Sequence, residues 1–344
     1  MSDHVIHRVF KIFVAAVVVS VFVVPTHAVS ETAKKPNIVL LYADDFGYTD
    51  LACQGSEYYE TPNLDRFAKE GMVFTDGYAA AANCAPSRAA LMSGAYAPRT
   101  GIYTVAGPRF GSAKHRQLMH VKSGSKLKPG VVSMAEALKS NGYQTCHIGK
   151  WHLGPDPTQH GFDINVGGHQ KGFPRSYFSP YKNGNLPDGP VGEHLPDRLA
   201  KEACQWMEQK KDSGPFFVYL AFYSVHSPVQ ARYDLAKKYE KKPASEHHWD
   251  VKYAAMVEAM DLAVGDVLKY LDESGLADNT LVVFTSDNGP HGRYSNAKPL
   301  RGNKGLYYEG GVREPFFVRC PGVTKPGSIN HTPVHQVDLY PTFL

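Results

Sequence analysis

Several residues that could bind ions or transfer protons follow short apolar runs of the sequence. The apolar runs, each of strand length, are 37–42, 143–148, 215–225 and 280–285. The chemically active residues that follow them are Asp44, Asp45, Lys150, His152, His226, Asp287 and Asn288. A single Asp or Asn after a strand is usually a turn residue. Ligands of open α/β sheets bind outside the carboxyl ends of the strands, so four such groups favour one shared site.

Part of this set offers oxygen ligands. Those residues are Asp44, Asp45, Asp287 and Asn288. Oxygen ligands suit a hard divalent cation, Ca²⁺ or Mg²⁺, and a cation would relieve the repulsion between adjacent carboxylates. On spacing alone, two helix N-caps and turns explain the pattern equally well. Zinc is disfavoured because no group of His and Cys residues has the spacing of a zinc site.

A cysteine stands at the predicted start of a helix, in the segment 83–88. Pro86 suits the first turn of a helix, and residues 89–92 continue it. Cys84 would then lie where backbone N–H groups and the helix dipole favour an anion, and Arg88 could reach the same anion. A buried, inert thiol is the alternative interpretation of a single cysteine.

Segments with helical spacing alternate with the apolar runs. They cover 63–70, 133–142, 197–211 and 249–274. Ser133 and Glu136 have the spacing of a capping box, which marks the start of the second helix. Strands that alternate with helices favour an α/β fold, with a mostly parallel sheet covered on both faces. The run 316–319 is a candidate for one further strand.

Composition excludes several classes of protein. The 344 residues are 43% hydrophobic, which is too apolar for a disordered chain. The formal net charge of +4 gives no strong argument for nucleic acid, and none is expected as a partner. Five cysteines without a C-x-x-C pair argue against a disulfide scaffold. Because their number is odd, at least one cysteine is unpaired or has another use.

The first residues have the pattern of a secretory signal peptide. Arg8 and Lys11 precede an apolar or small run at 12–24, and small residues lead to a cleavage site after Ala28. The run is shorter than the ~20 residues that a membrane-spanning helix needs. We therefore expect residues 1–28 to be removed and the protein to be exported, periplasmic or secreted, without a stable membrane span.

Five ordered motifs resemble those of the type I sulfatases, formylglycine-dependent and arylsulfatase-like enzymes of the alkaline phosphatase superfamily. Residues 84–94 resemble the signature C-x-P-S-R-x-x-L-x-T-G, with Ser93 as the one conservative departure. The segment 142–154 resembles the second signature of the family. The remaining similar segments are 36–47, 287–289 and the block of 300–305 with 308–315. The similarity extends from Pro36 to the last residue.

The resemblance implies an alkaline-phosphatase-like α/β/α sandwich around a large, mostly parallel mixed sheet. It also implies that residues 36–344 form the catalytic domain. The family usually adds a smaller C-terminal region after a segment like 337–342, and this chain stops at Leu344. We therefore expect that C-terminal subdomain to be missing or truncated.

The resemblance also implies roles for individual residues. Cys84 would be oxidised to formylglycine, whose hydrate is the nucleophile, by a formylglycine-generating enzyme. Ca²⁺, with Mg²⁺ as the alternative, would be held by Asp44, Asp45, Asp287, Asn288 and the modified Cys84. The catalytic positions would be Cys84, Arg88, Lys150, His152, His226 and Lys304. Lys150 and Lys304 would grip the sulfate oxygens, and Arg88 would orient the formylglycine. His226 would be the general acid, and His152 would deprotonate the gem-diol.

The expected reaction is hydrolysis of sulfate esters on a sulfated carbohydrate or an aryl sulfate. One alternative is a phosphonate or phosphate monoester hydrolase of the same superfamily, and another is a non-catalytic protein that binds sulfated glycans. The stretch 107–130 is basic, with Lys114, Arg116 and Lys122 among its cations and no acidic residue. It is either a binding region for a polyanionic substrate or an ordinary solvated loop.

Overall fold

A central strand, β1 (Asn37–Ala43), is buried along its whole length in the computed structural model, which describes residues 34–105, 112–115, 117–119 and 121–344. Its branched apolar residues suit a strand that is covered on both faces. β1 pairs in parallel with β6 (Phe216–Ala221) and β7 (Thr280–Ser286). β4 (Gln144–Gly149) pairs in parallel with β6 and with β5 (Ile164–Val166).

The main sheet has the strand order β5-β4-β6-β1-β7-β8-β2-β9. β8 (Phe316–Arg319) is antiparallel to β7 and to β2 (Met72–Phe74), and β9 (Ser328–Asn330) is parallel to β2. The predicted α/β fold with a large, mostly parallel mixed sheet is therefore confirmed, and the run 316–319 is its antiparallel strand. Two short strands, β3 (Gly77–Tyr78) and β10 (Val334–His335), pair separately.

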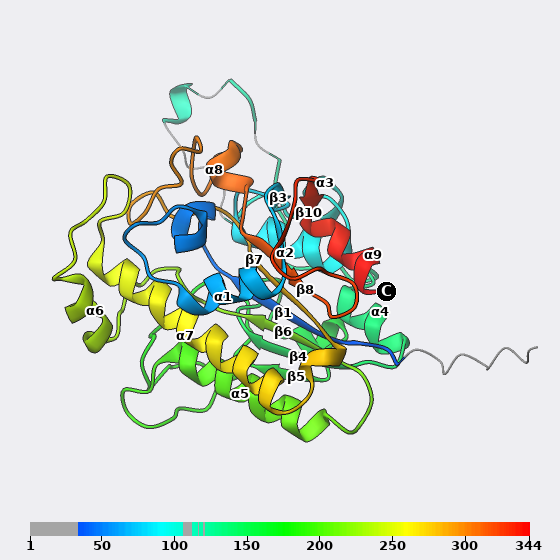
Figure 1. The fold of residues 1–344 in the computed structure, drawn as a ribbon. Helices are drawn as coiled ribbons and strands as arrows, with labels where there is room; N and C mark the ends of the chain where they lie inside the picture. Colours follow the sequence, from blue (N-terminus) through cyan, green and yellow to red (C-terminus); the bar gives the residue numbers. More distant parts are fainter. Residues whose placement is uncertain (1–33, 106–111, 116, 120) are drawn as a thin grey trace, which may run out of the picture. The chain divides into compact units, whose positions relative to one another are not determined.

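Three helices cover one face of the sheet. They are α1 (Pro62–Glu70), α5 (Leu195–Lys210) and α7 (Val251–Glu273) (Figure 1). Val39 and Leu41 of β1 pack into this layer with the buried side chains of these helices. A shorter helix, α6 (Tyr233–Tyr239), packs against α7. Because alternate residues of a strand face opposite sides, the other half of β1 must be covered by a second layer.

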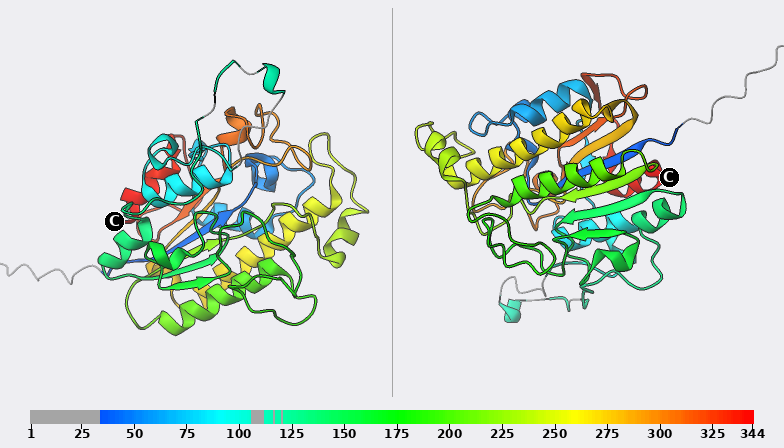
Figure 2. Two further views of the ribbon diagram at one scale, coloured as in Figure 1. Left: turned by 180° about the vertical axis from the view of Figure 1, so that it is seen from behind. Right: turned by 90° about the horizontal axis from the view of Figure 1, so that it is seen from below.

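The opposite face carries that second layer, which Figure 2 shows from two further directions. Its helices are α2 (Cys84–Ser93), α4 (Met134–Ser140) and α9 (Leu339–Phe343). Ile38 and Leu40 of β1 pack here with buried side chains of the three helices. The remaining short helices are α3 (Ala97–Thr100), α8 (Glu309–Val312) and the 3₁₀ segments Tyr48–Asp50, Ala52–Gln54, Ala113–His115, Pro157–His160, Ala277–Asn279 and Gln336–Asp338.

The local sequence signals act as expected at several helix and strand ends. Ser133 Oγ accepts from the Glu136 N–H, and the Glu136 carboxylate accepts from the Ser133 N–H, so the capping box is present. β6 ends at Ala221, earlier than the apolar run suggests. The next residues still follow β1, because Phe222 N–H donates to Tyr42 C=O, but they turn out of the regular ladder. That turn carries the chain to His226.

The described part of the chain contains no helix that is both long and apolar enough to span a bilayer. The predicted signal peptide, residues 1–28, lies outside the described residues. Within the basic stretch, Lys114 and Lys122 are exposed, whereas Arg109 and Arg116 also lie outside the described residues.

Candidate active site

Four neighbouring strands, β4, β6, β1 and β7, end at one edge of the sheet. Each is followed by residues that the sequence singled out, in the order Lys150 with His152, His226, Asp44 with Asp45, and Asp287 with Asn288. The three aspartates, Asn288 and Lys150 are almost completely buried. The expectation that these residues share one edge is correct, because the strands that carry them are adjacent and parallel.

Cys84 reaches this edge from the second layer, as the first residue of α2. Its Sγ lies 4.0 Å from Asp45 Oδ1. The same sulfur lies within 4.8 Å of ligand atoms in two groups, one with Asp45 and His226 and one with Asp44 and Asp287. The predicted cysteine at a helix start therefore lies in the middle of the predicted oxygen ligands.

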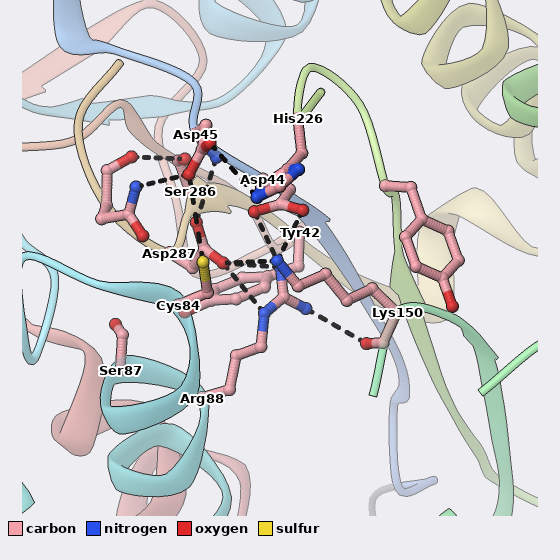
Figure 3. A network of polar contacts seen from close by, with 12 residues as sticks. Tyr42, Asp44, Asp45, Cys84, Ser87, Arg88, Lys150, His226, Ser286 and Asp287 are labelled. Atoms are coloured by element: carbon pink, nitrogen blue, oxygen red, sulfur yellow. Dashed lines mark hydrogen bonds and ion pairs between the residues drawn. The ribbon is translucent and has the colours of Figure 1, made fainter. Parts of the chain in front are cut away.

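The three carboxylates are paired with three cations. Lys150 Nζ lies 2.6 Å from Asp44 Oδ2, and Lys304 Nζ lies 2.6 Å from Asp45 Oδ1. The Arg88 guanidinium lies 2.7 Å from Asp287 Oδ2 through Nη2 and donates to the same oxygen through Nε. Figure 3 shows Arg88 and Lys150 pointing toward the same group of carboxylates. Burying a charge is costly unless it is paired in this way, so removing any one partner leaves an uncompensated charge.

Burial and charge act against each other on these groups. Burial raises the pKa of Asp44 well above its usual value, although Lys150 opposes the shift. Burial would also raise the pKa of Asp45, but the charges of Lys304 and its other cationic neighbours together outweigh burial and hold that pKa low. Burial favours a lower pKa for Lys304, but Asp45, Asp44 and the other neighbouring groups together reverse this, so that the net pKa is raised. Asp45 and Lys304 therefore stabilise each other as ions.

The Cys84 thiol differs from an activated cysteine nucleophile. Burial raises its pKa to about 11, even though Lys150 and Lys304 favour the thiolate. A thiol with that pKa is protonated at neutral pH, whereas reactive cysteines have lowered values. The pairing of the nearby cations with carboxylates explains why they do not activate the sulfur.

Two histidines flank the cluster. His226 Nε2 lies 3.8 Å from Asp45 Oδ2, while its Nδ1 lies 2.7 Å from the Ser227 carbonyl and donates to it in the neutral ring. Burial lowers the pKa of His226 to about 4, against the opposing charge of Asp45. Burial also lowers the pKa of His152 to about 2, and the charges of Lys150 and Arg88 add to this shift. Both imidazoles are therefore neutral near pH 7.

The residues present fit a hard divalent cation. Asp44 Oδ1 and Asn288 Oδ1 are buried and have no hydrogen-bond partner within the described part of the chain. Together with the carboxylates of Asp45 and Asp287 they form a set of oxygen donors, which Ca²⁺ and Mg²⁺ prefer. Counted as ions, the three carboxylates and their three paired cations cancel in charge. A divalent cation would leave the site positive and ready to attract an anion.

Sequence reasoning missed Gln336, which holds the site together from the C-terminal end of the chain. Its Oε1 accepts hydrogen bonds from Tyr42 Oη and from Ser87 Oγ, each at 2.8 Å. Its Nε2 donates to the Ser286 carbonyl. This fully buried amide thus joins β1, α2 and β7, the three elements that carry most of the site. A glutamine carries no charge and belongs to no charged motif, so no signal in the sequence marked it.

The sequence profile of the sulfatase family matches residues 36–344. The chain belongs to the sulfatase family. It is 37% identical to a sulfatase of Formosa agariphila, with 96% of this chain and 72% of the relative covered. It is 34% identical to human N-acetylgalactosamine-6-sulfatase, which it matches over 92% of this chain and 62% of the relative. Human arylsulfatase A is 33% identical, with 90% of this chain and 64% of the relative covered.

Solved structures agree with this assignment. The structure of Ps i-CgsB in complex with k-i-k-neocarrahexaose matches with a TM-score of 0.76 and 33% identity, covering 90% of this chain and 71% of the other. A phosphonate monoester hydrolase of Agrobacterium radiobacter matches with a TM-score of 0.66 and 19% identity, which shows a shared fold alone. The chain spans about three fifths of the length of the human relatives.

Replacing Gln336 with alanine tests its structural role. Gln336→Ala leaves the hydroxyls of Tyr42 and Ser87 without their acceptor in a buried position, so we expect unfolding to become easier by roughly 2–4 kcal/mol. Urea unfolding measures this change. The control Gln209→Ala, at an exposed position of α5, changes the free energy of unfolding by less than about 0.5 kcal/mol. Equal effects of the two substitutions would contradict the role given to Gln336.

Proposed function

We propose that this chain hydrolyses sulfate esters by cleaving the S–O bond. The observation that carries the proposal is the position of Cys84, at the start of α2 among oxygen ligands and three cations, of which Arg88 and Lys150 are buried. A sulfate ester is an anion with dispersed charge, so attack at its sulfur requires positive groups around its oxygens. Membership of the sulfatase family supports the same reaction.

The proposed nucleophile is formylglycine, formed from Cys84 by oxidation of its Cβ to an aldehyde with loss of the sulfur. A separate formylglycine-generating enzyme and an external oxidant would carry out this maturation. One hydroxyl of the hydrated aldehyde attacks sulfur, and the bond from sulfur to the alcohol oxygen breaks. The second hydroxyl then loses its proton, the C–O bond to sulfate breaks, and the aldehyde is restored. Addition of one water molecule to this aldehyde regenerates the hydrate.

The surrounding residues have distinct proposed roles. Lys150 and Lys304 hold the sulfate oxygens, and Arg88 orients the nucleophile. His226 gives a proton to the leaving alcohol, since a bound sulfate anion raises the pKa of a neighbouring imidazole. The neutral His152 takes the proton of the second hydroxyl.

A divalent cation completes the proposed site. Ca²⁺, with Mg²⁺ as the alternative, would be held by Asp44, Asp45, Asp287, Asn288 and the modified Cys84. When bound, it supplies positive charge that the sulfate oxygens require. The buried, unpartnered oxygens of Asp44 and Asn288 support this placement.

The proposed substrate is a sulfated carbohydrate, with aryl sulfates as small substitutes. Support comes from relatives named for N-acetylgalactosamine-6-sulfate chemistry and from the solved complex with a neocarrahexaose. The proposal that the protein is exported to the periplasm or secreted depends on the signal-like pattern of residues 1–28.

Paired esters separate this function from the alternatives. The cationic groups suit phosphate as well, so matched aryl sulfate, phosphate and phosphonate esters are compared by kcat/KM. We expect the sulfate ester to be the best substrate. A higher kcat/KM on the phosphate or phosphonate ester would assign the chain to that hydrolase class. Binding of sulfated glycans without turnover by fully modified protein would support the non-catalytic alternative.

The modification of Cys84 is directly measurable. The tryptic peptide 70–88 of protein from its native host should carry an aldehyde or its hydrate at this position in place of the thiol. Cys84→Ser should reduce kcat by at least about 10³-fold, because it removes the covalent route. The control Cys53→Ser, at an exposed cysteine, should keep most of the activity. An unmodified and fully active Cys84 protein would contradict the mechanism.

Metal binding is testable without activity. Ca²⁺ added to protein treated with a chelator should stabilise the fold by about 2.7 kcal/mol at a concentration of one hundred times its Kd. Asp44→Asn should remove most of this gain, which thermal unfolding measures. The matched control Asp278→Asn, at an exposed position, should retain it. A Ca²⁺ response that survives Asp44→Asn unchanged would show that the ion binds elsewhere, and Mg²⁺ is compared in parallel.

A further inference from the structure

The loop that follows β5 runs directly beside the two histidines of the site. The His152 N–H donates to the His169 carbonyl at 3.0 Å. Gly172 lies so close to the His152 ring that a Cβ on this glycine would overlap it. The Phe173 ring is stacked on the His226 ring, with centroids 6.4 Å apart and planes 13° apart. A group bound against residues 169–173 of this loop would therefore lie next to the proposed reaction centre.

The same loop forms a cavity of about 450 Å³. This volume falls in the range of small-molecule sites. Its wall consists of Pro155, His169–Lys171, Arg175 and Lys182–Asn185. The wall reaches Lys171, whose neighbour Gly172 contacts His152. The cavity and the reaction centre thus share one continuous segment of chain.

The wall of the cavity is strongly cationic. Lys171, Arg175 and Lys182 are exposed, and none of them forms an ion pair with any residue that the structure describes. No aspartate or glutamate belongs to the wall. Burial lowers the pKa of His169, and the charges of Lys171 and Arg175 lower it further. This effect is consistent with both cations lying close to the His169 ring.

Backbone conformation sets Lys182 apart. It has a φ of 55°, in the left-handed region that disfavours side chains other than those of glycine and asparagine. Among described residues other than glycine, only Asp45 and His152 share such a positive φ, and both lie at the reaction centre. Strained backbone of this kind gathers where function requires it. Lys182 is thus held at a conformational cost on the wall of the cavity.

Gln170 adds a polar group to the cationic wall. Its Nε2 donates to the Ser125 carbonyl at 2.7 Å, which fixes the amide. Its Oε1 is buried and has no partner in the described ranges. Ser125 belongs to the basic stretch, where Lys122 and Lys126 are exposed, so further cations lie along the same part of the chain.

We propose that this cavity binds a second anionic group of the substrate, carried by a sugar next to the one that bears the scissile sulfate. The second group is a sulfate or a carboxylate, since both take charge-assisted hydrogen bonds from lysine and arginine. The preferred substrate is then a polyanionic oligosaccharide. This inference rests on the proposed sulfate-ester hydrolysis and deepens it.

The test compares a triple variant with the unaltered enzyme on substrates that differ at the neighbouring sugar. Lys171→Gln, Arg175→Gln and Lys182→Asn together remove the cations, and asparagine tolerates the left-handed backbone. The substrates are a small aryl sulfate and three oligosaccharides whose neighbouring sugar carries a sulfate, a carboxylate or no charge. We expect KM to rise about tenfold for the anionic oligosaccharide that the cavity prefers, with smaller changes for the other substrates. The control Lys252→Gln, at an exposed position of α7, leaves all values unchanged.

Two outcomes separate the failure of this inference from the failure of the proposed function. Equal changes of KM on charged and uncharged neighbours would overturn the cavity as an anion site. If the enzyme hydrolyses no sulfate ester, the proposed function fails. The cavity can then still be tested by measuring how tightly the protein binds an anionic oligosaccharide. In a Cys84→Ser background, calorimetric titration with the disulfated oligosaccharide should give a Kd about tenfold weaker in the triple variant. An unchanged Kd there would overturn the inference.

Discussion

Three carboxylates are buried against three cations at the edge of the sheet where β4, β6, β1 and β7 end. Ions in such a place are stable only as a set, because each unpaired charge would cost several kcal/mol. The strands must therefore end in register, and α2 and the segment that carries Lys304 must reach the same point. Counted as ions, the three carboxylates and the three cations cancel in charge. One bound divalent cation and one bound anion would therefore leave no large net charge of either sign.

The elements around this cluster serve to hold it in one arrangement. Gly149 has a φ of 95°, and a side chain there would overlap the Ala221 carbonyl, to which the Lys150 N–H donates. Lys150 is thus brought against β6 at the end of β4. On the other layer, Gln336 ties Ser87 of α2 to the ends of β1 and β7. The first device acts through backbone geometry, and the second acts through buried hydrogen bonds of one side-chain amide.

The proposed chemistry and the proposed specificity come from different parts of the fold. The strand ends and α2 supply the reacting groups on rigid elements. The loop after β5 supplies Phe173 and the cationic cavity, and it contacts the site through the two histidines. Loops tolerate change more readily than strands, so under this proposal the loop could vary while the reacting groups stay the same.

Much of the fold and most of the site followed from local patterns in the sequence. Buried runs, the capping box at Ser133 and the helix start at Cys84 are local features, because they depend on residues a few positions apart. The convergence of polar residues at one edge also followed, since parallel strands align their carboxyl ends. Lys304 was predicted as a site residue only through the family resemblance, because nothing near it in the sequence indicates that it lies beside Asp45.

Pairings between distant residues required the folded chain. Gln336 meets Ser87 across 249 residues, and Lys304 meets Asp45 across 259. The antiparallel direction of β8, the left-handed Lys182 and the cationic cavity are likewise invisible in a linear pattern. Hydrophobic periodicity and helix-capping residues indicate which side chains of each segment are buried and where the segment begins and ends. Which buried charge finds which partner depends on how the segments pack, and that is a property of the whole chain.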